Sequence, residues 1–457
     1  MFREAVTVSK FSMVIRPPRH IVNVRKHLSA DGLYALLCAA FLKIPDHRRE
    51  GSPIPLVDTL MSAFAMFALK DPSLLAFEER RNDENMRNLF RIRGLPCDTQ
   101  MREILDPMDP EQLRPVFGSV FRELQRGQAL KPLVFYQGCY LLLMDGTQYF
   151  SSQQIHCDSC LKKVDAETGE VTYQHQILAA VLAHPDHKEV IPLPPEPICQ
   201  QDGNTKNDCE RNASKRLLCK IRKEHPRLKL IVVEDGLASN APHIRDLIAL
   251  HMHFILGAKP GDHEFLFDQL IAAFEDDRVT TISWKVGDGQ AEISFVNQVP
   301  LNASNPDLLV NVLHYVEYGP DGKQRKVFTW VTDLCITRSN APLLVRGARA
   351  RWKIENETFN TLENQGYHFE HNYGHGKQHL SVVFSMLMML AFLVDQTQQL
   401  CCPLFRAVWK KVGSKRALWD NLRSHFRHFT FQSMKHLYEV ILYSLAKNLP
   451  APRLDSS

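Results

Sequence analysis

The spacing of apolar residues predicts helices along the first 130 residues. Residues 57–69 form a strongly apolar run of helical length, and residues 111–125 place apolar positions three to four residues apart. Asp98 and Thr99 followed by Glu103 match the start of another helix. Pro115 fits the helix at 111–125 only in its first turn. We therefore expect a mainly α-helical region over residues 1–130.

Near residue 140 the pattern becomes that of a sheet flanked by helices. Short runs rich in β-branched and aromatic residues mark strands, and helical periodicity separates the later ones. We expect strands at 140–150, 172–183, 189–194, 228–233 and 253–258, and helices at 207–225 and 241–251. Three strands followed by alternating strand and helix indicate a mixed α/β fold.

A second strand-rich pattern covers residues 278–332. Apolar and polar residues alternate over four runs, at 280–286, 291–296, 310–318 and 326–331. Neighbouring runs are joined by Gly-Asp-Gly and Gly-Pro-Asp-Gly turns, which are typical of β-hairpins. These features predict a β-rich insertion between two parts of the α/β region, residues 131–277 and 333–399.

The most apolar run of the chain lies at 380–394. It is interrupted by Ser381 and Ser385, and it is shorter than the roughly 20 residues needed to cross a bilayer. We therefore expect a buried helix and no membrane segment. Residues 400–457 are helical in pattern and carry ten Lys/Arg against three Asp/Glu, which predicts a basic C-terminal tail.

Composition agrees with a soluble globular protein of two or three domains. The chain has 457 residues, of which 44% are hydrophobic and 23% charged. A net charge of +4 permits a nucleic-acid partner without requiring one. Eleven cysteines with little paired spacing, and no apolar signal segment at the start, favour a reducing cytoplasm.

Two of the expected strands lead into an Asp-Gly pair. Asp145 follows the run at 141–144, and Asp235 follows the run at 230–233, so each carboxylate is expected at the mouth of the sheet where the chain turns. A simple turn produces the same local pattern. Glu234 is the alternative to Asp235, but adjacent strand residues point to opposite faces, and Gly236 frees the backbone beside Asp235.

The third acidic candidate is Glu355. Trp352, Glu355, Phe359 and Leu362 recur at helical spacing, so a helix here would place Glu355 within an apolar stripe that faces the core. Glu357 would point away from that stripe. Arg351 lies four residues before Glu355, where it can form an ion pair with it or bind a phosphate.

These segments resemble the DDE transposases of bacterial insertion sequences. The resemblance is to the broad branch called insertion sequence family four, whose catalytic Glu lies in an Arg-Trp-x-Ile-Glu-x-x-Phe helix, and it covers residues 141–394. That branch often has a Tyr three positions before the Arg and a Lys seven positions after the Glu. This chain has Ala348 and Leu362 at those positions.

The resemblance implies a fold, a chemistry and partners. It implies an RNase H-like mixed sheet interrupted by the β-rich insertion, in which Asp145, Asp235 and Glu355 hold two Mg²⁺ or Mn²⁺ ions and Asp145 bridges both. Water would cleave the first strand, and the freed 3′ hydroxyl would attack next. It further implies double-stranded DNA as partner, a homodimer on synapsed ends, and a bacterial, nucleoid-associated location. A catalytically inactive DNA-binding descendant and a metal-dependent nuclease on the same fold are the alternatives.

Several side chains are candidates for DNA contact, each with a plainer explanation. Aromatic residues of the insertion could stack on an unpaired base or belong to a strand core, the polar loop at 371–377 could touch DNA or simply face solvent, and the basic tail could neutralise phosphates or be a solvated face. The candidates are Arg351, Trp284, Trp330, His371, His375, Lys377, Lys410, Lys411, Lys415 and Arg416.

A Cys-x-x-Cys motif, Cys157 and Cys160, follows the first catalytic strand. Such a pair can form half of a zinc site, with His175, Cys199 or Cys209 as distant completions. Two free thiols in a hairpin loop would have the same sequence. Both interpretations stay open at this point.

Overall fold

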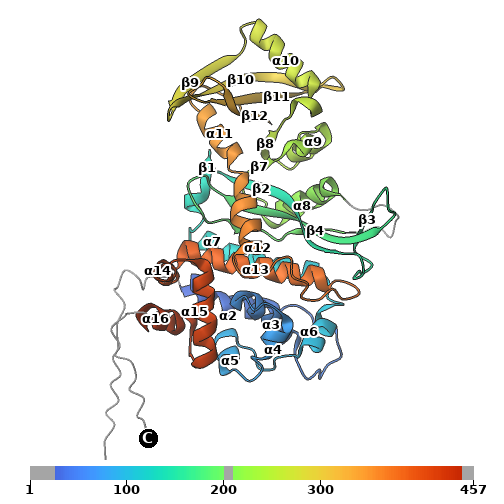
Figure 1. Ribbon diagram of the computed structural model, residues 1–457, viewed down its shortest axis with the longest axis vertical. Coiled ribbons are helices and arrows are strands. Elements are labelled where there is room, and N and C mark those ends of the chain that lie inside the picture. Colours follow the sequence, from blue (N-terminus) through green and yellow to red (C-terminus); the bar gives the residue numbers. More distant parts are fainter. Residues whose placement is uncertain (1–25, 200–208, 445–457) are drawn as a thin grey trace, which may run out of the picture.

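The computed structural model describes residues 26–199 and 209–444, and its elements are labelled in Figure 1. The first two residues of the expected helix at 207–225, and parts of the expected N- and C-terminal regions, lie outside this range. Within it, the chain has a mixed α/β architecture, as the sequence predicts.

Helices form the N-terminal region. The apolar helix expected at 57–69 is α3, and almost all of its side chains are buried. The helices expected near Asp98 and at 111–125 are α6 and α7, and Pro115 lies in the first turn of α7. The elements are η1 (Lys26–Leu28), α2 (Ala30–Phe41), α3 (Leu56–Leu69), α4 (Leu74–Glu78), α5 (Glu84–Phe90), α6 (Asp98–Leu105), η2 (Pro110–Leu113), α7 (Arg114–Arg126) and η3 (Lys131–Leu133).

Twelve described strands form one sheet in the order β3-β4-β2-β7-β8-β12-β11-β10-β9, with β1 on β2 and with β5 and β6 on β4. Strands β2, β7 and β8 run parallel, and the other pairs are antiparallel. The strands are β1 (Val134–Tyr136), β2 (Cys139–Ser152), β3 (Leu161–Val164), β4 (Val171–Ala183), β5 (Ile191–Pro192), β6 (Glu196–Ile198), β7 (Leu230–Glu234), β8 (His253–Gly257), β9 (Thr280–Val286), β10 (Gly289–Asn302), β11 (Asn305–Tyr318) and β12 (Gln324–Thr332).

The strand-rich segment at 278–332 extends this same sheet. Its four expected strands are β9 to β12, and β12 pairs with β8 through Val331 and Leu256. They form the upper end of the molecule in Figure 1. The backbone of β8, which would otherwise be an unpaired edge, is covered in this way. The helices between and after these strands are α8 (Glu210–Glu224), η4 (Gly236–Ala238), α9 (Ala241–Ala249), η5 (Pro260–Asp262), α10 (Glu264–Glu275) and α11 (Ala341–Arg349).

The chain after α11 returns to the N-terminal helices. It contains the π-helix η6 (Ile354–Phe359), α12 (Asn360–Asn364), α13 (Leu380–Cys401), α14 (Pro403–Val412), α15 (Lys415–His428) and α16 (Met434–Ser444). Helix α13 packs against α3, and the two helical regions lie together at the lower end of Figure 1.

Helix α13 confirms the expected buried helix, but it is longer than the run at 380–394. By length and composition alone it could cross a membrane, yet 94% of its most apolar window is buried inside the protein. Polar residues from Asp395 to Gln399 continue the helix and are buried too. Asp395 forms an ion pair with the fully buried Lys70 at the end of α3, at 2.6 Å, which joins the N-terminal helices to this central helix.

Candidate functional site

Asp145 lies in the middle of β2, not at its end. The strand expected at 140–150 is confirmed as β2, whereas the turn expected at Asp145 and Gly146 is wrong. Strand β2 continues to Ser152 because its pairing with β4 continues, with Asp145 opposite Ala179. The Asp145 side chain is 23% exposed. Its carboxylate is therefore carried by a strand that is paired with β4 at this position and with β7 up to Leu143.

Asp235 follows the last residue of β7 and lies next to Asp145. Strands β2 and β7 are parallel, with Leu143 opposite Val233, so the same register places Asp145 beside Asp235 two residues further on. The Asp235 side chain accepts a hydrogen bond from the Leu237 N–H at 3.0 Å, which begins the short helix η4. The expected position at a strand end is confirmed for this residue.

Glu355 lies in the π-helix rather than in a regular α-helix. The predicted stripe is only partly right, because Phe359 and Leu362 are buried while Trp352 is 48% exposed and the Glu355 side chain 47% exposed. Ile354 takes the buried position beside them. The wider π turn changes which side chains share a face, and single π turns often occur at functional sites. Glu355 therefore faces solvent instead of being set into the core.

Arg351 joins two of the three carboxylates. Its Nη1 donates to Asp145 Oδ2 at 2.9 Å, and its Nη2 donates to Glu355 Oε1 at 2.7 Å. The ion pair with Glu355 confirms one of the two roles considered for Arg351, and the bridge to Asp145 adds a contact across 206 residues of sequence. The two arms of one guanidinium hold the strand and the π-helix together at this point.

The electrostatics show that the three acidic groups share one environment. Burial raises the pKa of Asp145 to about 6; Arg351 opposes this rise, and the negative charges of Glu355 and Asp235 add to it. A divalent cation would relieve this repulsion, and carboxylate oxygens are the ligands that Mg²⁺ and Mn²⁺ prefer. These donor types suit a hard divalent metal, but among the described residues the group of ligands that lies close enough together to hold a metal ion is the Cys/His cluster described below.

Glu210, in the first turn of α8, is a fourth acidic residue at the site that the sequence analysis missed. Its carboxylate lies against Gly146, where an added Cβ would come within 2.8 Å of Glu210 Oε2. Burial raises its pKa to about 7, and the charges of Asp145, Asp235 and Glu234 add to the rise. Acidic residues are common in first helical turns, so the sequence carries no specific signal for this one.

Glu234 is held in a different network. Its side chain is buried, accepts a hydrogen bond from Ser214 at 3.2 Å and pairs with His243 at 2.6 Å. A cleft beside β7 is lined by Glu210, Glu234, Asp235 and His243 among others. Because Glu234 is already paired, Asp235 is the freer carboxylate at this strand end.

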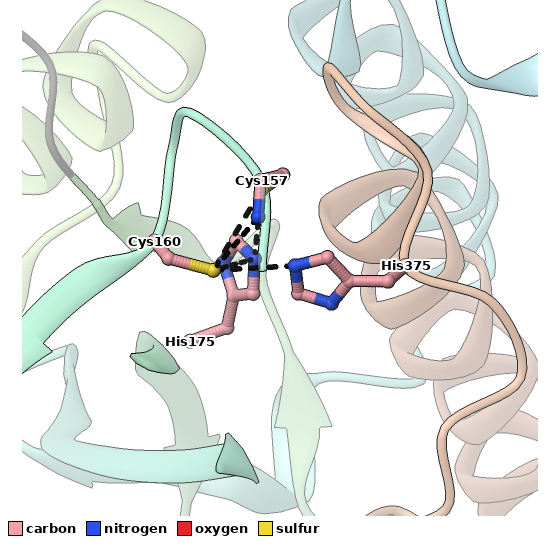
Figure 2. Close-up of side chains that lie close together, drawn as sticks. All are labelled: Cys157, Cys160, His175 and His375. Carbon is pink, nitrogen blue, oxygen red and sulfur yellow. Dashed lines mark hydrogen bonds between the residues drawn. The ribbon is translucent and has the colours of Figure 1, made fainter. Parts of the chain in front are cut away.

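A separate cluster gathers the Cys-x-x-Cys motif and two histidines (Figure 2). Cys157 and Cys160 lie between β2 and β3, His175 lies on β4, and His375 lies in the loop before α13. All four side chains are buried, and their ligand atoms lie within 4.8 Å of one another. The cluster could hold a metal ion.

The cluster shows which of the candidate residues lies beside the Cys-x-x-Cys pair as a further metal ligand. His175 belongs to it, whereas Cys199 and Cys209 do not. The fourth member, His375, was expected either to contact DNA or to lie at the plain surface, and both expectations are wrong because only 7% of it is exposed. Only the three-dimensional fold brings it to Cys160, 215 residues earlier.

The other candidates for DNA contact differ in exposure. Trp284 is 36% exposed, while Trp330 is 7% exposed and stacks on Phe328 with ring centroids 5.5 Å apart, so Trp330 is a core residue of the sheet. His371 and Lys377 are exposed, and the backbone N–H of Lys377 donates to Asp106 at 2.9 Å.

The basic residues of the C-terminal helices are mostly at the surface. Lys410, Lys411 and Arg416 are exposed. Lys415 is partly buried, with its ammonium group 5.3 Å from the centre of the Trp409 ring, and burial lowers its pKa. Three of the four residues therefore remain available to a polyanion.

Comparison with known protein families gives no matching family model, and no curated protein matches the chain.

Proposed function

We propose that this protein is a DNA transposase of the DDE class, which cleaves phosphodiester bonds at the ends of an insertion sequence and joins them to a target. The observation that carries the proposal is the convergence of Asp145, Asp235 and Glu355. The first two are adjacent through the register of β2 and β7, and Arg351 links the first to the third. The residues come from three distant parts of the chain, in the order that the resemblance implies.

The strand order supports an RNase H-like catalytic region. In that fold, three antiparallel strands are followed by two strands parallel to the first. Here β4 and the short β5 and β6 succeed β2 with antiparallel pairing, and β7 and β8 follow in parallel with β2. The insertion then extends the sheet from β8 before the chain reaches Glu355.

The proposed roles follow from the donors. Asp145, Asp235 and Glu355 would hold Mg²⁺ or Mn²⁺, which when bound activate a nucleophilic oxygen and neutralise charge on the phosphate. When no metal ion is bound, Arg351 pairs with Asp145 and Glu355. Once the two carboxylates bind metal ions, the Arg351 guanidinium is free to donate two hydrogen bonds to a DNA phosphate. Glu210, with a pKa of about 7, can accept or release a proton beside Asp145.

The remaining surface provides groups suited to DNA. Lys410, Lys411 and Arg416 are exposed cations. Trp352, next to Arg351, and Trp284, on the outermost strand β9, are exposed aromatic rings. Cations give salt-dependent phosphate binding, and aromatic rings can stack on unpaired bases. A homodimer on paired DNA ends remains part of the proposal.

The test is cleavage and joining of DNA that carries the flanking element ends, with Mg²⁺ or Mn²⁺. The parent should cleave and join, and Asp145→Ala, Asp235→Ala and Glu355→Ala should each lose both activities while retaining DNA binding. Glu357→Ala is the matched control, because Glu357 lies two residues from Glu355 and makes no contact with Asp145. Binding without cleavage by the parent would indicate an inactive DNA-binding descendant, and cleavage without joining would indicate a nuclease.

A further inference from the structure

The Cys/His cluster lies apart from the acidic site and is explained by none of the chemistry above. We propose that Cys157, Cys160, His175 and His375 bind one structural Zn²⁺ ion. In this role, the metal fastens the loop that follows Glu355 to the strands that follow Asp145. The proposal does not depend on the transposase activity.

The sulfur–sulfur distance matches a tetrahedral zinc site, and the sulfur–nitrogen distances are shorter than those of such a site by about 0.2–0.4 Å. The two sulfurs are 3.8 Å apart, and His175 Nε2 lies 3.3 Å from Cys157 Sγ and 3.4 Å from Cys160 Sγ. His375 Nε2 lies 3.2 Å from Cys160 Sγ. Zinc bonds of about 2.3 Å to sulfur and about 2.0–2.1 Å to nitrogen separate tetrahedral ligands by about 3.8 Å for two sulfurs and about 3.6 Å for sulfur and nitrogen.

The chemistry of the donors selects zinc and a structural role. Two thiolates and two imidazoles are the Cys₂His₂ set of structural zinc sites, and they are poor ligands for Mg²⁺. All four residues are buried, so four protein ligands close the site and leave no position for water or substrate. The proposed zinc therefore has no direct part in cleavage.

Hydrogen bonds alone do not account for the burial of His375. Its Nδ1 is buried and has no hydrogen-bond partner among the described residues, and its only side-chain hydrogen-bond partners there are the thiols of Cys157 and Cys160, with Nε2 3.2 Å from Cys160 Sγ. A thiol is a weak hydrogen-bond partner, so this arrangement is costly without a metal. A bond from Nε2 to zinc would offset that cost.

The loop that carries His375 is also fixed on its other side. Asp106, at the end of α6, accepts backbone N–H groups from Lys377 at 2.9 Å, Gln378 at 2.9 Å and Leu380 at 3.1 Å, and so caps α13. Gly376, with φ of 68°, lets the chain pass, because an added Cβ would come within 2.2 Å of the Asp106 carboxylate. The loop is thus held to the N-terminal helices by Asp106 and to the sheet by His375.

This placement gives the metal a specific mechanical role. Strand β2 carries Asp145 and leads to Cys157, and the π-helix carries Glu355 and leads to His375. The ion would join these two chain segments beyond the acidic site. Its loss should loosen the loop at 366–379 before it affects the rest of the fold.

The first experiment measures metal in the full-length protein, purified under reducing conditions without a histidine tag. We expect one zinc per chain by plasma mass spectrometry. Replacement by Co²⁺ should produce the visible bands of a tetrahedral ion and a thiolate-to-cobalt charge-transfer band. A reduced, folded protein that contains no zinc and gives no such bands on Co²⁺ titration would overturn the proposal.

Matched variants locate the site. Cys160→Ser and His375→Ala should lose zinc, whereas Cys199→Ser and His371→Ala should keep one zinc per chain. Cys199 is a buried cysteine outside the cluster, and His371 is an exposed histidine of the same loop. Equal zinc in all four variants would contradict the assignment.

A measurement on the unaltered protein covers the case in which the cluster variants fail to fold. Stripping zinc with a chelator should increase proteolysis or amide hydrogen exchange in the loop at 366–379, and adding zinc back should restore protection. The helix α10, at the upper end of the molecule in Figure 1 and away from β3, β4 and α13, serves as internal reference. Unchanged protection of the loop after complete removal of bound zinc would refute the fastening role.

Discussion

Arg351 Nη1 lies 2.9 Å from Asp145 Oδ2, and this contact ties the end of the Arg-Trp-x-Ile-Glu motif to the central strand of the sheet. The other arm of the same guanidinium holds Glu355 at 2.7 Å. A positive group therefore lies between two carboxylates that the proposed mechanism assigns to metal ions.

Arg351→Ala should separate metal binding from cleavage. Without the guanidinium, Mn²⁺ no longer competes with an internal cation, so its affinity should be unchanged or tighter by isothermal titration calorimetry. Cleavage should fall by a factor of about 10 or more, because one charge-assisted phosphate contact is lost. Arg346→Ala is the control, since Arg346 pairs with Asp186 at the surface. Weaker Mn²⁺ binding by Arg351→Ala would contradict this role.

The affinity for Mn²⁺ should increase with pH. Asp145 has a pKa of about 6 and Glu210 a pKa of about 7, so both carboxyl groups are protonated and neutral at low pH. A metal ion binds deprotonated carboxylates, so protonation of these groups weakens its binding. Titration at about pH 5.5 should give weaker binding than at about pH 7.5, with proton release on binding at the lower pH. Glu210→Gln should remove the upper part of this dependence. A pH-independent affinity would show that these carboxyl groups do not face the metal.

Asp145→Asn should stabilise the metal-free protein at neutral pH. The pKa of Asp145 is about 6 in the folded state and about 3.9 in an unfolded chain. The folded state therefore holds more protons between these values, and the contribution of Asp145 to stability declines as pH rises through about 6. Denaturation in EDTA at pH 7 should show a gain on the order of 1 kcal/mol, less than the full shift because the group is partly exposed.

Asp46→Asn provides the opposite case. Its hydrogen bond with Arg48 is the main cause that lowers the pKa of Asp46 to about 2. That contribution to stability is present above the unfolded pKa and is lost as pH falls through about 2. Asp46→Asn should therefore lower stability at pH 7. Destabilisation by both substitutions would show that the two carboxyl groups do not differ in the way described.

The local pattern of apolar and polar residues was enough to predict most helices and strands, but not which strands pair with one another. The strands at 172–183 and 253–258 appear as β4 and β8, because alternation and β-branched residues report the local conformation. The strand expected at 140–150 also appears, as β2, but the Asp-Gly pair wrongly predicted a turn within it, because the pairing of Asp145 with Ala179 keeps the strand extended there. In the same way, the insertion joins β8 through contacts that are remote in sequence.

The candidate site shows the same division. The acidic residues were found because each has a local pattern, whereas the stripe around Glu355 was wrong in part because a period of 3.6 residues was assumed where the chain forms a π turn. Cys157 and Cys160 are three residues apart, and this spacing indicates a possible metal site. His375 and Glu210 reach their partners only through the fold, so no spacing rule identifies them.

Removing one partner of the buried pair of Lys70 and Asp395 should strongly destabilise the protein. Lys70 Nζ is enclosed, lies 2.6 Å from Asp395 and faces the rings of Tyr367 at 4.1 Å and Trp419 at 4.2 Å. Asp395→Ala would leave a buried ammonium group unpaired, and a loss of roughly 3–5 kcal/mol is expected in urea denaturation.

The matched control for this pair is at the surface. Arg245 and Asp307 form an exposed ion pair at 2.8 Å, and Asp307→Ala should change stability by less than about 1 kcal/mol. The double variant Lys70→Met with Asp395→Leu should recover much of the loss, since it removes both buried charges. A similar loss from Asp307→Ala and Asp395→Ala would contradict the importance of burial.

The exposed tryptophans should affect DNA, and the buried one should affect folding. Trp284 and Trp352 are 36% and 48% exposed, and Trp352 lies edge-on to Phe328 with ring centroids 6.4 Å apart. Trp352→Ala and Trp284→Ala should reduce the capture of an unpaired base, read by 2-aminopurine placed near the element end. The expected cost is about 1–3 kcal/mol per stacked base. Trp330→Ala should instead lower the thermal stability, because its ring is packed on Phe328. A loss of base capture by Trp330→Ala at unchanged stability would show that the sheet opens to present the buried ring, and would refute the assignment of stacking to the exposed pair.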